Sequence, residues 1–110
     1  MRQYVIDEMR LDDFDRVKAH LDKRFEASEV EGVYWIELDE DVLSDEQKRH
    51  RECRPHCFAV ELTPGALSVE LLVRSKTFLK CACMAYADPR QRRWLMDRVD
   101  AIFEKLEISV

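Results

Sequence analysis

The sequence predicts an α+β fold: a two-layer sandwich in which a mainly antiparallel sheet of about four or five strands carries two amphipathic helices on one face. Three observations predict it. Helical periodicity occurs near both ends of the chain, segments rich in β-branched and aromatic residues lie between, and Pro64-Gly65 is a strong turn signal. The chain of 110 residues is 46% hydrophobic and 37% charged. We therefore expect residues 1–110 to form a single domain with one core.

The first strand and the first helix are predicted from a change in the spacing of apolar residues along the chain. Residues 3–8 are rich in β-forming residues, with Tyr4 and Ile6 on one face. Apolar residues then recur at steps of three and four, which predicts a helix of about four turns capped by Asp12 or Asp13. The apolar positions of this helix are Leu11, Phe14, Val17, Leu21 and Phe25.

A second strand and a short polar helix follow. Residues 33–39 alternate well enough for a strand whose inward side chains are Tyr34, Ile36 and Leu38. Ser44 and Gln47 have the spacing of a capping box, which predicts a helix over residues 45–53. This helix has no large aliphatic or aromatic residue, so an apolar stripe cannot hold it and another interaction must.

The next segment predicts a three-stranded antiparallel meander over residues 57–62, 67–73 and 78–86. A four-residue loop at Pro64-Gly65 pairs Leu62 with Leu67. Two registers remain open for the third strand: a four-residue loop places Cys81 and Cys83 on the outer face, and a three-residue loop places them in the core.

The last helix opens at Asp88-Pro89, a capping residue followed by proline at the first helical position. Its apolar stripe runs to the end of the chain through Leu95, Val99, Ile102, Phe103 and Leu106.

Composition excludes several classes of function. The net charge of −5 makes nucleic acid and anionic lipid unlikely partners. Only two glycines, Gly32 and Gly65, are present, which excludes glycine-rich phosphate-binding loops. We find neither a signal peptide nor a run long enough to span a bilayer, so we expect a cytoplasmic protein with reduced thiols.

One group of residues has metal-ligating chemistry. The spacing H-x-x-C-x-x-H-C begins at His50, and two further thiols follow in Cys81-Ala82-Cys83. Thiolate and imidazole are the ligands that zinc prefers, and a bound ion would also explain how the polar helix is held. The alternative is that the cysteines are small packing residues and no cofactor is bound. The candidate ligands are His50, Cys53, His56, Cys57, Cys81 and Cys83.

The function that the sequence predicts first is non-enzymatic: an interaction module that binds a protein partner or forms a homodimer through the sheet face that the helices leave open. We assign no catalytic residue, because no glycine-flanked nucleophile with an oriented histidine is recognisable. The candidate interaction residues on that face are Glu61, Ser68, Glu70, Leu72 and Leu79. A zinc or thiol site is the alternative function, and anion or nucleic-acid binding at Arg90–Trp94 is a minor one.

Overall fold

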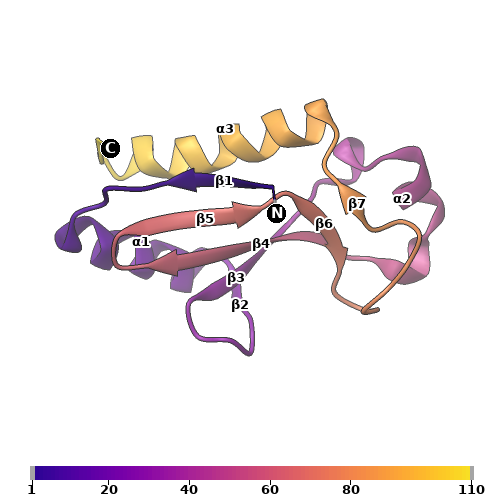
Figure 1. Cartoon of the computed structure of the whole chain (residues 1–110), viewed down its shortest axis with the longest axis horizontal. Helices are drawn as coiled ribbons and strands as arrows, with labels where there is room; N and C mark the ends of the chain where they lie inside the picture. Colours follow the sequence, from indigo (N-terminus) through magenta and orange to yellow (C-terminus); the bar gives the residue numbers. More distant parts are fainter. Residues whose placement is uncertain (1, 110) are drawn as a thin grey trace.

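The computed structural model describes residues 2–109 and shows an α+β fold with an open antiparallel sheet (Figure 1). The strand order is β1-β5-β4-β3-β2, and β6 extends the sheet from β4 to β7. The strands are β1 (Gln3–Ile6), β2 (Glu26–Ala27), β3 (Val33–Glu37), β4 (His56–Thr63), β5 (Ala66–Glu70), β6 (Leu72–Ser75) and β7 (Ala85–Tyr86). The fold class is therefore as the sequence predicts, with more and shorter strands.

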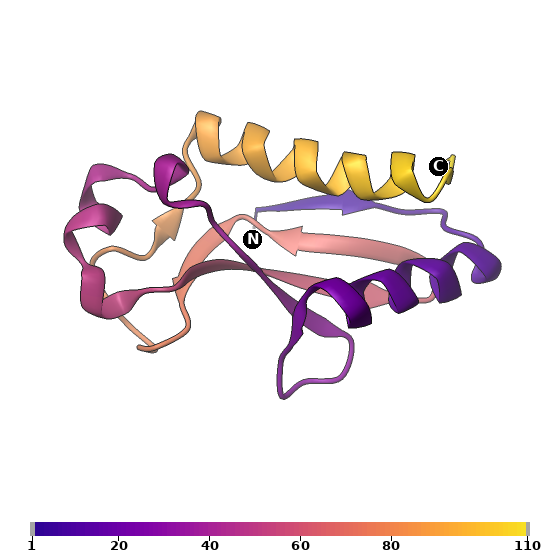
Figure 2. The ribbon, with the colours of Figure 1, turned by 180° about the vertical axis from the view of Figure 1, so that it is seen from behind.

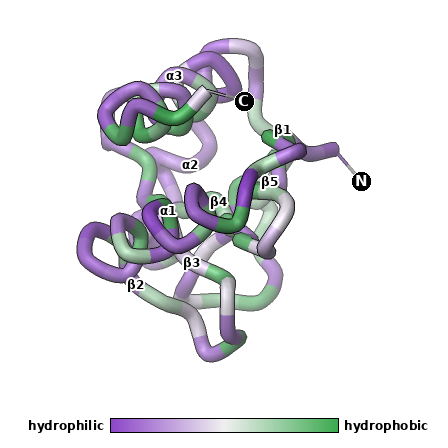
Figure 3. Tube along the Cα trace, turned by 90° about the vertical axis from the view of Figure 1, so that its left-hand side faces the viewer, coloured by the Kyte–Doolittle hydropathy of each residue, from purple (hydrophilic) through white to green (hydrophobic). Residues whose placement is uncertain are grey.

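Two long helices, α1 (Leu11–Arg24) and α3 (Pro89–Lys105), cover the same face of the sheet (Figures 2 and 3). The short helix α2 (Asp45–Arg49) and two 3₁₀ turns, η1 (Glu40–Val42) and η2 (Arg51–Cys53), lie at one end of the molecule beside β7. Among residues 2–109, no helix combines the length and the apolar composition needed to cross a membrane.

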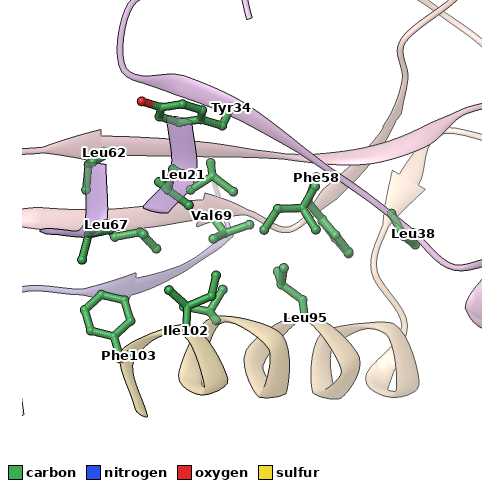
Figure 4. Packing of buried hydrophobic residues seen from close by; sticks show 14 of the residues in the cluster. Leu21, Tyr34, Leu38, Phe58, Leu62, Leu67, Val69, Leu95, Ile102 and Phe103 are labelled. Carbon is green, nitrogen blue, oxygen red and sulfur yellow. The ribbon is translucent and has the colours of Figure 1, made fainter. Parts of the chain in front are cut away.

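The core fills the space between the helices and the sheet (Figure 4). Phe58 and Val69 from the sheet and Leu95 from α3 are completely buried. The predicted inward residues of β3, Tyr34 and Ile36, are buried as expected because strand side chains alternate between faces. Burying a large side chain of this kind stabilises the fold by about 1.5–3 kcal/mol.

The capping box predicted for the short helix and the cap predicted at Asp88 for the last helix are both formed, and Asp88 also forms a capping box with Gln91. Ser44 caps α2 and Asp88 caps α3, and in each the glutamine three residues later returns a hydrogen bond to the capping backbone. The cap predicted for α1 is wrong. The N-cap residue of α1 is Arg10, whose side chain forms no capping hydrogen bond. Leu11, which the sequence placed on the apolar face of this helix, is 69% exposed.

The hairpin register at Pro64-Gly65 is confirmed, since Leu62 pairs with Leu67. The second strand of the meander is broken at Leu71, whose N–H donates to Arg2 and whose carbonyl accepts from Ala87. Beyond this break, β6 pairs with β4, and Arg74 lies opposite Cys57. The break lets β6 separate from β5 and turn toward the end of the molecule that carries α2.

The third meander strand, predicted over residues 78–86, is wrong except for β7. Residues 76–84 form an irregular segment, which we call the cysteine loop. The Ser75 hydroxyl accepts from the N–H groups of Thr77 and Phe78 and donates to the carbonyl of Cys53 at 2.5 Å. Side-chain hydrogen bonds thus replace the ladder, and neither predicted register for Cys81 and Cys83 applies.

Candidate metal centre

Four potential ligands from two distant segments meet at the end of the molecule formed by α2 and the cysteine loop. Within the described residues, His50, Cys53, Cys81 and Cys83 place one ligand atom each so that all four lie within 4.8 Å of one another. The Cys81 Sγ is 3.1 Å from the His50 Nδ1 and 3.1 Å from the Cys53 Sγ. All four cysteines of the chain are unpaired thiols.

These dimensions suit a single tetrahedral ion. Zinc binds cysteine sulfur at about 2.3 Å, so two sulfurs of a tetrahedral site lie about 3.8 Å apart. The Cys53–Cys81 sulfur separation of 3.1 Å lies below that value, and the limit of 4.8 Å for all four ligand atoms lies above it. An ion at the centre therefore requires only small outward shifts of the side chains.

The local structure explains how each segment presents its ligands. His50 ends α2 and Cys53 ends η2, and this spacing of three residues brings the two side chains to one side of the helical segment. In the cysteine loop, the N–H of Met84 donates to the carbonyl of Cys81, which closes a tight turn. The turn brings Cys81 and Cys83 to the same centre, as a strand would not.

The cluster has one thiol that ionises easily. The backbone N–H of Cys83, and then the thiols of Cys53 and Cys83, hydrogen-bond Cys81 and lower its pKa to about 7. Burial raises the pKa of Cys83 to about 12, and the hydrogen bond to Cys81 raises the pKa of Cys53. A divalent cation at this centre would take the place of the thiol protons, because metal-bound cysteine is a thiolate.

A carboxylate orients the histidine. The Nδ1 of His50 faces Cys81, and the opposite ring nitrogen, Nε2, lies 3.0 Å from the Oε1 of Glu46. An imidazole that donates its second N–H to a carboxylate is the usual arrangement of a metal-bound histidine. A carboxylate at Nε2 favours the tautomer that carries its proton there and leaves Nδ1 free to accept a metal ion.

Two buried glutamines form hydrogen bonds that hold the cysteine loop next to the candidate metal centre. The side-chain N–H of Gln47 donates to the carbonyl of Cys83 at 3.3 Å. The Gln91 side chain in turn donates to the Gln47 Oε1 at 2.9 Å and to the carbonyl of Val42 at 3.0 Å. Because each glutamine also completes a capping box, this network joins the starts of α2 and α3 to the cysteine loop.

The other two predicted ligands, His56 and Cys57, lie outside this group of four. His56 is 98% buried and its Nε2 lies 3.3 Å from the Cys83 Sγ, so it contacts a ligand. Cys57 is equally buried, but its Sγ lies 3.9 Å from the carbonyl of Pro55, and burial raises its pKa to about 12. Adjacent residues of a strand point to opposite faces, which is why the two side chains separate.

We expect His56 to tune the metal rather than bind it. Its Nε2 lies 3.3 Å from the Cys83 sulfur and, when it carries the ring proton, donates to that sulfur; such outer contacts typically change metal affinity about 10- to 100-fold. His56→Leu should therefore weaken zinc binding at least about tenfold while the stoichiometry is kept, as measured by competition with a chromophoric chelator. His56→Gln, which keeps an N–H donor, is the matched control; equal affinity in all three proteins would refute this role.

The predicted interaction residues lie partly in the sheet and partly in the cysteine loop. Glu61 is exposed and pairs with Ser68 across β4 and β5, and Glu70 is held by Arg74 at 2.6 Å. Leu72 is half-buried in β6. Leu79 lies in the cysteine loop instead of a strand, and it is 95% exposed.

Trp94, which belongs to the predicted anion or nucleic-acid site at Arg90–Trp94, is engaged in packing. Trp94 stacks on Phe58 with ring centroids 6.4 Å apart, and its indole N–H donates to Asp39 at 3.3 Å. The Arg90 guanidinium contacts the carbonyl of Leu43 at 3.5 Å. Trp94 thus has a packing role that leaves less of its ring for stacking on a base.

Glu46, Gln47 and Gln91 are the functional residues that the sequence did not indicate as such. Gln47 was visible as part of a capping box and Gln91 was not singled out, and capping-box spacing carries no information about a contact between two helices. Comparisons of the chain with protein-family models, curated proteins and solved structures gave no match. Function is therefore inferred from the residues of the site.

Proposed function

We propose that this protein binds one zinc ion through His50, Cys53, Cys81 and Cys83 and uses it as a structural cross-link. The observation that carries the proposal is the convergence of four soft or borderline ligand atoms within 4.8 Å of one another. Three thiols and one imidazole form a ligand set that suits zinc far better than magnesium or calcium, which bind oxygen. The second-nitrogen contact of His50 to Glu46 supports the same assignment.

A structural role fits better than a catalytic one. Four protein ligands complete a tetrahedron, whereas catalytic zinc sites keep a position open for water or substrate. Cys53 and Cys83 are 98% and 99% buried, so two of the ligands lie away from solvent. The ion would act on stability, not on a substrate.

The need for a cross-link is evident from the segments that the ion would join. Helix α2 has five residues and only Gln47 among them is buried, so apolar packing contributes little to it. The cysteine loop lacks a strand ladder over residues 76–84. One ion would hold both segments against the end of β4.

The experiment is metal analysis of tag-free protein purified without chelators, together with alkylation of its thiols. We expect about one zinc ion per chain, and alkylation of Cys81, the most exposed of the three ligand thiols, only after a chelator is added. Cys57 should react only in denaturant in either case, and so serves as an internal control for burial. Protein without metal that remains metal-free after incubation with zinc would refute the proposal.

A second candidate function is an interaction module, favoured by apolar side chains next to the centre. Leu79 is 95% exposed and Phe78 is 45% exposed, both in the cysteine loop. The open face of the sheet, with Trp35 and Ala59 paired at its centre, adjoins them. We propose that this surface binds a second copy of the chain, since it combines apolar and charged side chains that a symmetric contact can pair.

Sedimentation equilibrium tests the second candidate. We expect a concentration-dependent dimer that Leu79→Ser weakens at least about tenfold, because a buried leucine contributes roughly 1.5–3 kcal/mol. Leu11→Ser is the matched control, since Leu11 is 69% exposed on α1, away from this surface. A monomer at every concentration would contradict the dimer.

A further inference from the structure

The two long helices flank a second candidate site, an open hollow remote from the cysteine cluster. A hollow of about 370 Å³ lies between α1 and α3. This volume is at the small end of the range of small-molecule sites, about 300–1,000 Å³. Its lining residues are His20, Arg24, Phe25, Arg98, Ala101, Ile102 and Lys105. We call it the interhelical pocket.

The polar lining of the pocket is entirely basic. Arg24 comes from the last turn of α1, and Arg98 and Lys105 lie about two turns apart on one side of α3. In the part of the chain that the structure describes, none of these three side chains forms an ion pair, while eight other ion pairs occur. Although the chain has a net charge of −5, three positive charges gather around this one hollow. The Arg98 guanidinium also lies over the Trp94 ring, 4.9 Å from its centroid.

Both helices place their nearby acids on the opposite flank. On α3, Asp100 accepts from the Tyr4 hydroxyl, and Asp97 also acts on Tyr4, so these carboxylates face β1. On α1, Asp22 binds Lys18 and the hydroxyl of Tyr34. These three acids thus have partners of their own. Two others, Glu26 and Glu37, line the adjoining hollow together with Arg24 and Arg98, and Glu26 forms an ion pair with Lys76.

The titration of His20 is consistent with a positive field. Burial lowers the pKa of His20, and the charges of Arg24 and Lys105 lower it further. Among the causes of this shift there is no carboxylate. Both charges therefore act at the imidazole without a compensating acid.

The remaining walls are apolar. Phe25 is half-buried, with its ring centroid 6.4 Å from that of His20, and Ile102 is buried at the base of α3. Ala101, the smallest lining residue, leaves the space between the helices open. The pocket therefore offers an apolar surface edged by cations.

We propose that the interhelical pocket binds a small organic anion, with its carboxylate, phosphate or sulfonate group between Arg24, Arg98 and Lys105 and its apolar part against Phe25 and Ile102. Arginine and lysine supply charge-assisted hydrogen bonds to such groups. The apolar walls favour an anion that carries an aromatic or aliphatic body over an inorganic ion. This site is independent of the zinc ion.

A pair of fluorescent probes tests the proposal in the full-length protein. 8-Anilino-1-naphthalenesulfonate is an aromatic anion, and N-phenyl-1-naphthylamine has the same rings without the sulfonate. We expect one saturable site for the anionic probe, at least about tenfold tighter than for the neutral probe, with affinity that falls as salt rises. Equal affinities for the two probes would overturn the proposal, because the site would then select only for apolar surface.

Two double variants locate the site. Arg24→Gln with Lys105→Gln should weaken the anionic probe at least about tenfold, because two charge-assisted contacts are lost. Arg10→Gln with Arg93→Gln makes the same change in net charge with exposed residues outside the pocket. Circular dichroism and thermal unfolding confirm that each variant is folded. Equal weakening in both double variants, or in neither, would overturn the assignment.

Discussion

Cys83→Ser is expected to abolish zinc binding and to lower the melting temperature more than any other single change discussed here. Cys83 is a buried ligand that lies against both His56 and the Gln47 side chain. Serine oxygen is a poor substitute for thiolate toward zinc. When free zinc exceeds its Kd about 1,000-fold, binding stabilises the folded state by about 4.1 kcal/mol, and that contribution would disappear.

For a chain of this size, such a loss corresponds to a decrease in melting temperature of roughly 15 °C or more. Differential scanning calorimetry with and without added zinc measures it. The variant should melt at the same temperature in zinc and in chelator, whereas the parent protein should melt higher in zinc. A variant that still gains stability from zinc would contradict the assigned ligand set.

Cys57→Ser is the matched control for this experiment. Cys57 is 99% buried, like Cys83, but it lies outside the cluster. Burying a hydroxyl in its place costs about 1–3 kcal/mol, and the response to zinc should be retained in full. The pair of variants separates loss of a ligand from loss of a buried thiol.

We expect Gln47→Leu and Gln91→Leu each to lower the free energy of unfolding by about 2–4 kcal/mol, the second largest effect. Each glutamine is 98% buried and hydrogen-bonds the other, together with a backbone carbonyl. Removing one side chain leaves its buried partners unsatisfied, at about 1–3 kcal/mol per group. Urea denaturation in the presence of saturating zinc measures the change in the free energy of unfolding.

The double variant Gln47→Leu with Gln91→Leu should be less destabilised than the sum of the two single variants. In each single variant one amide remains buried without its partner, and the double variant removes both. We expect a coupling of about 0.5–3 kcal/mol between the two sites. Strict additivity would show that the Gln47–Gln91 contact does not contribute to stability.

The elements that the sequence predicted well have a long, regular period or a local capping signal. Helices α1 and α3 follow apolar stripes, and the hairpin at Pro64-Gly65 follows a turn with fixed backbone requirements. Ser44 and Asp88 act within four residues of chain, so the sequence showed both as capping residues. The α1 cap failed because Asp12 and Asp13 lie inside the first turn.

The cysteine loop could not be predicted in this way. Phe78, Leu79 and Met84 give residues 78–84 the composition of a strand, but the segment is organised by side-chain hydrogen bonds and by its approach to η2. These contacts join residues more than 20 positions apart, and no local period encodes them. For the same reason the spacing could group six candidate ligands but could not choose the four that converge.

The most direct test of the proposed metal centre is the absorption spectrum of the protein loaded with cobalt(II), which occupies tetrahedral zinc sites and reports their geometry. We predict intense visible d–d bands of a tetrahedral ion and a thiolate-to-cobalt charge-transfer band, both saturating at about one equivalent and both displaced by zinc. Cys83→Ser should lose this spectrum and Cys57→Ser should keep it. A weak octahedral spectrum, or bands that survive Cys83→Ser unchanged, would contradict a metal centre formed by His50, Cys53, Cys81 and Cys83.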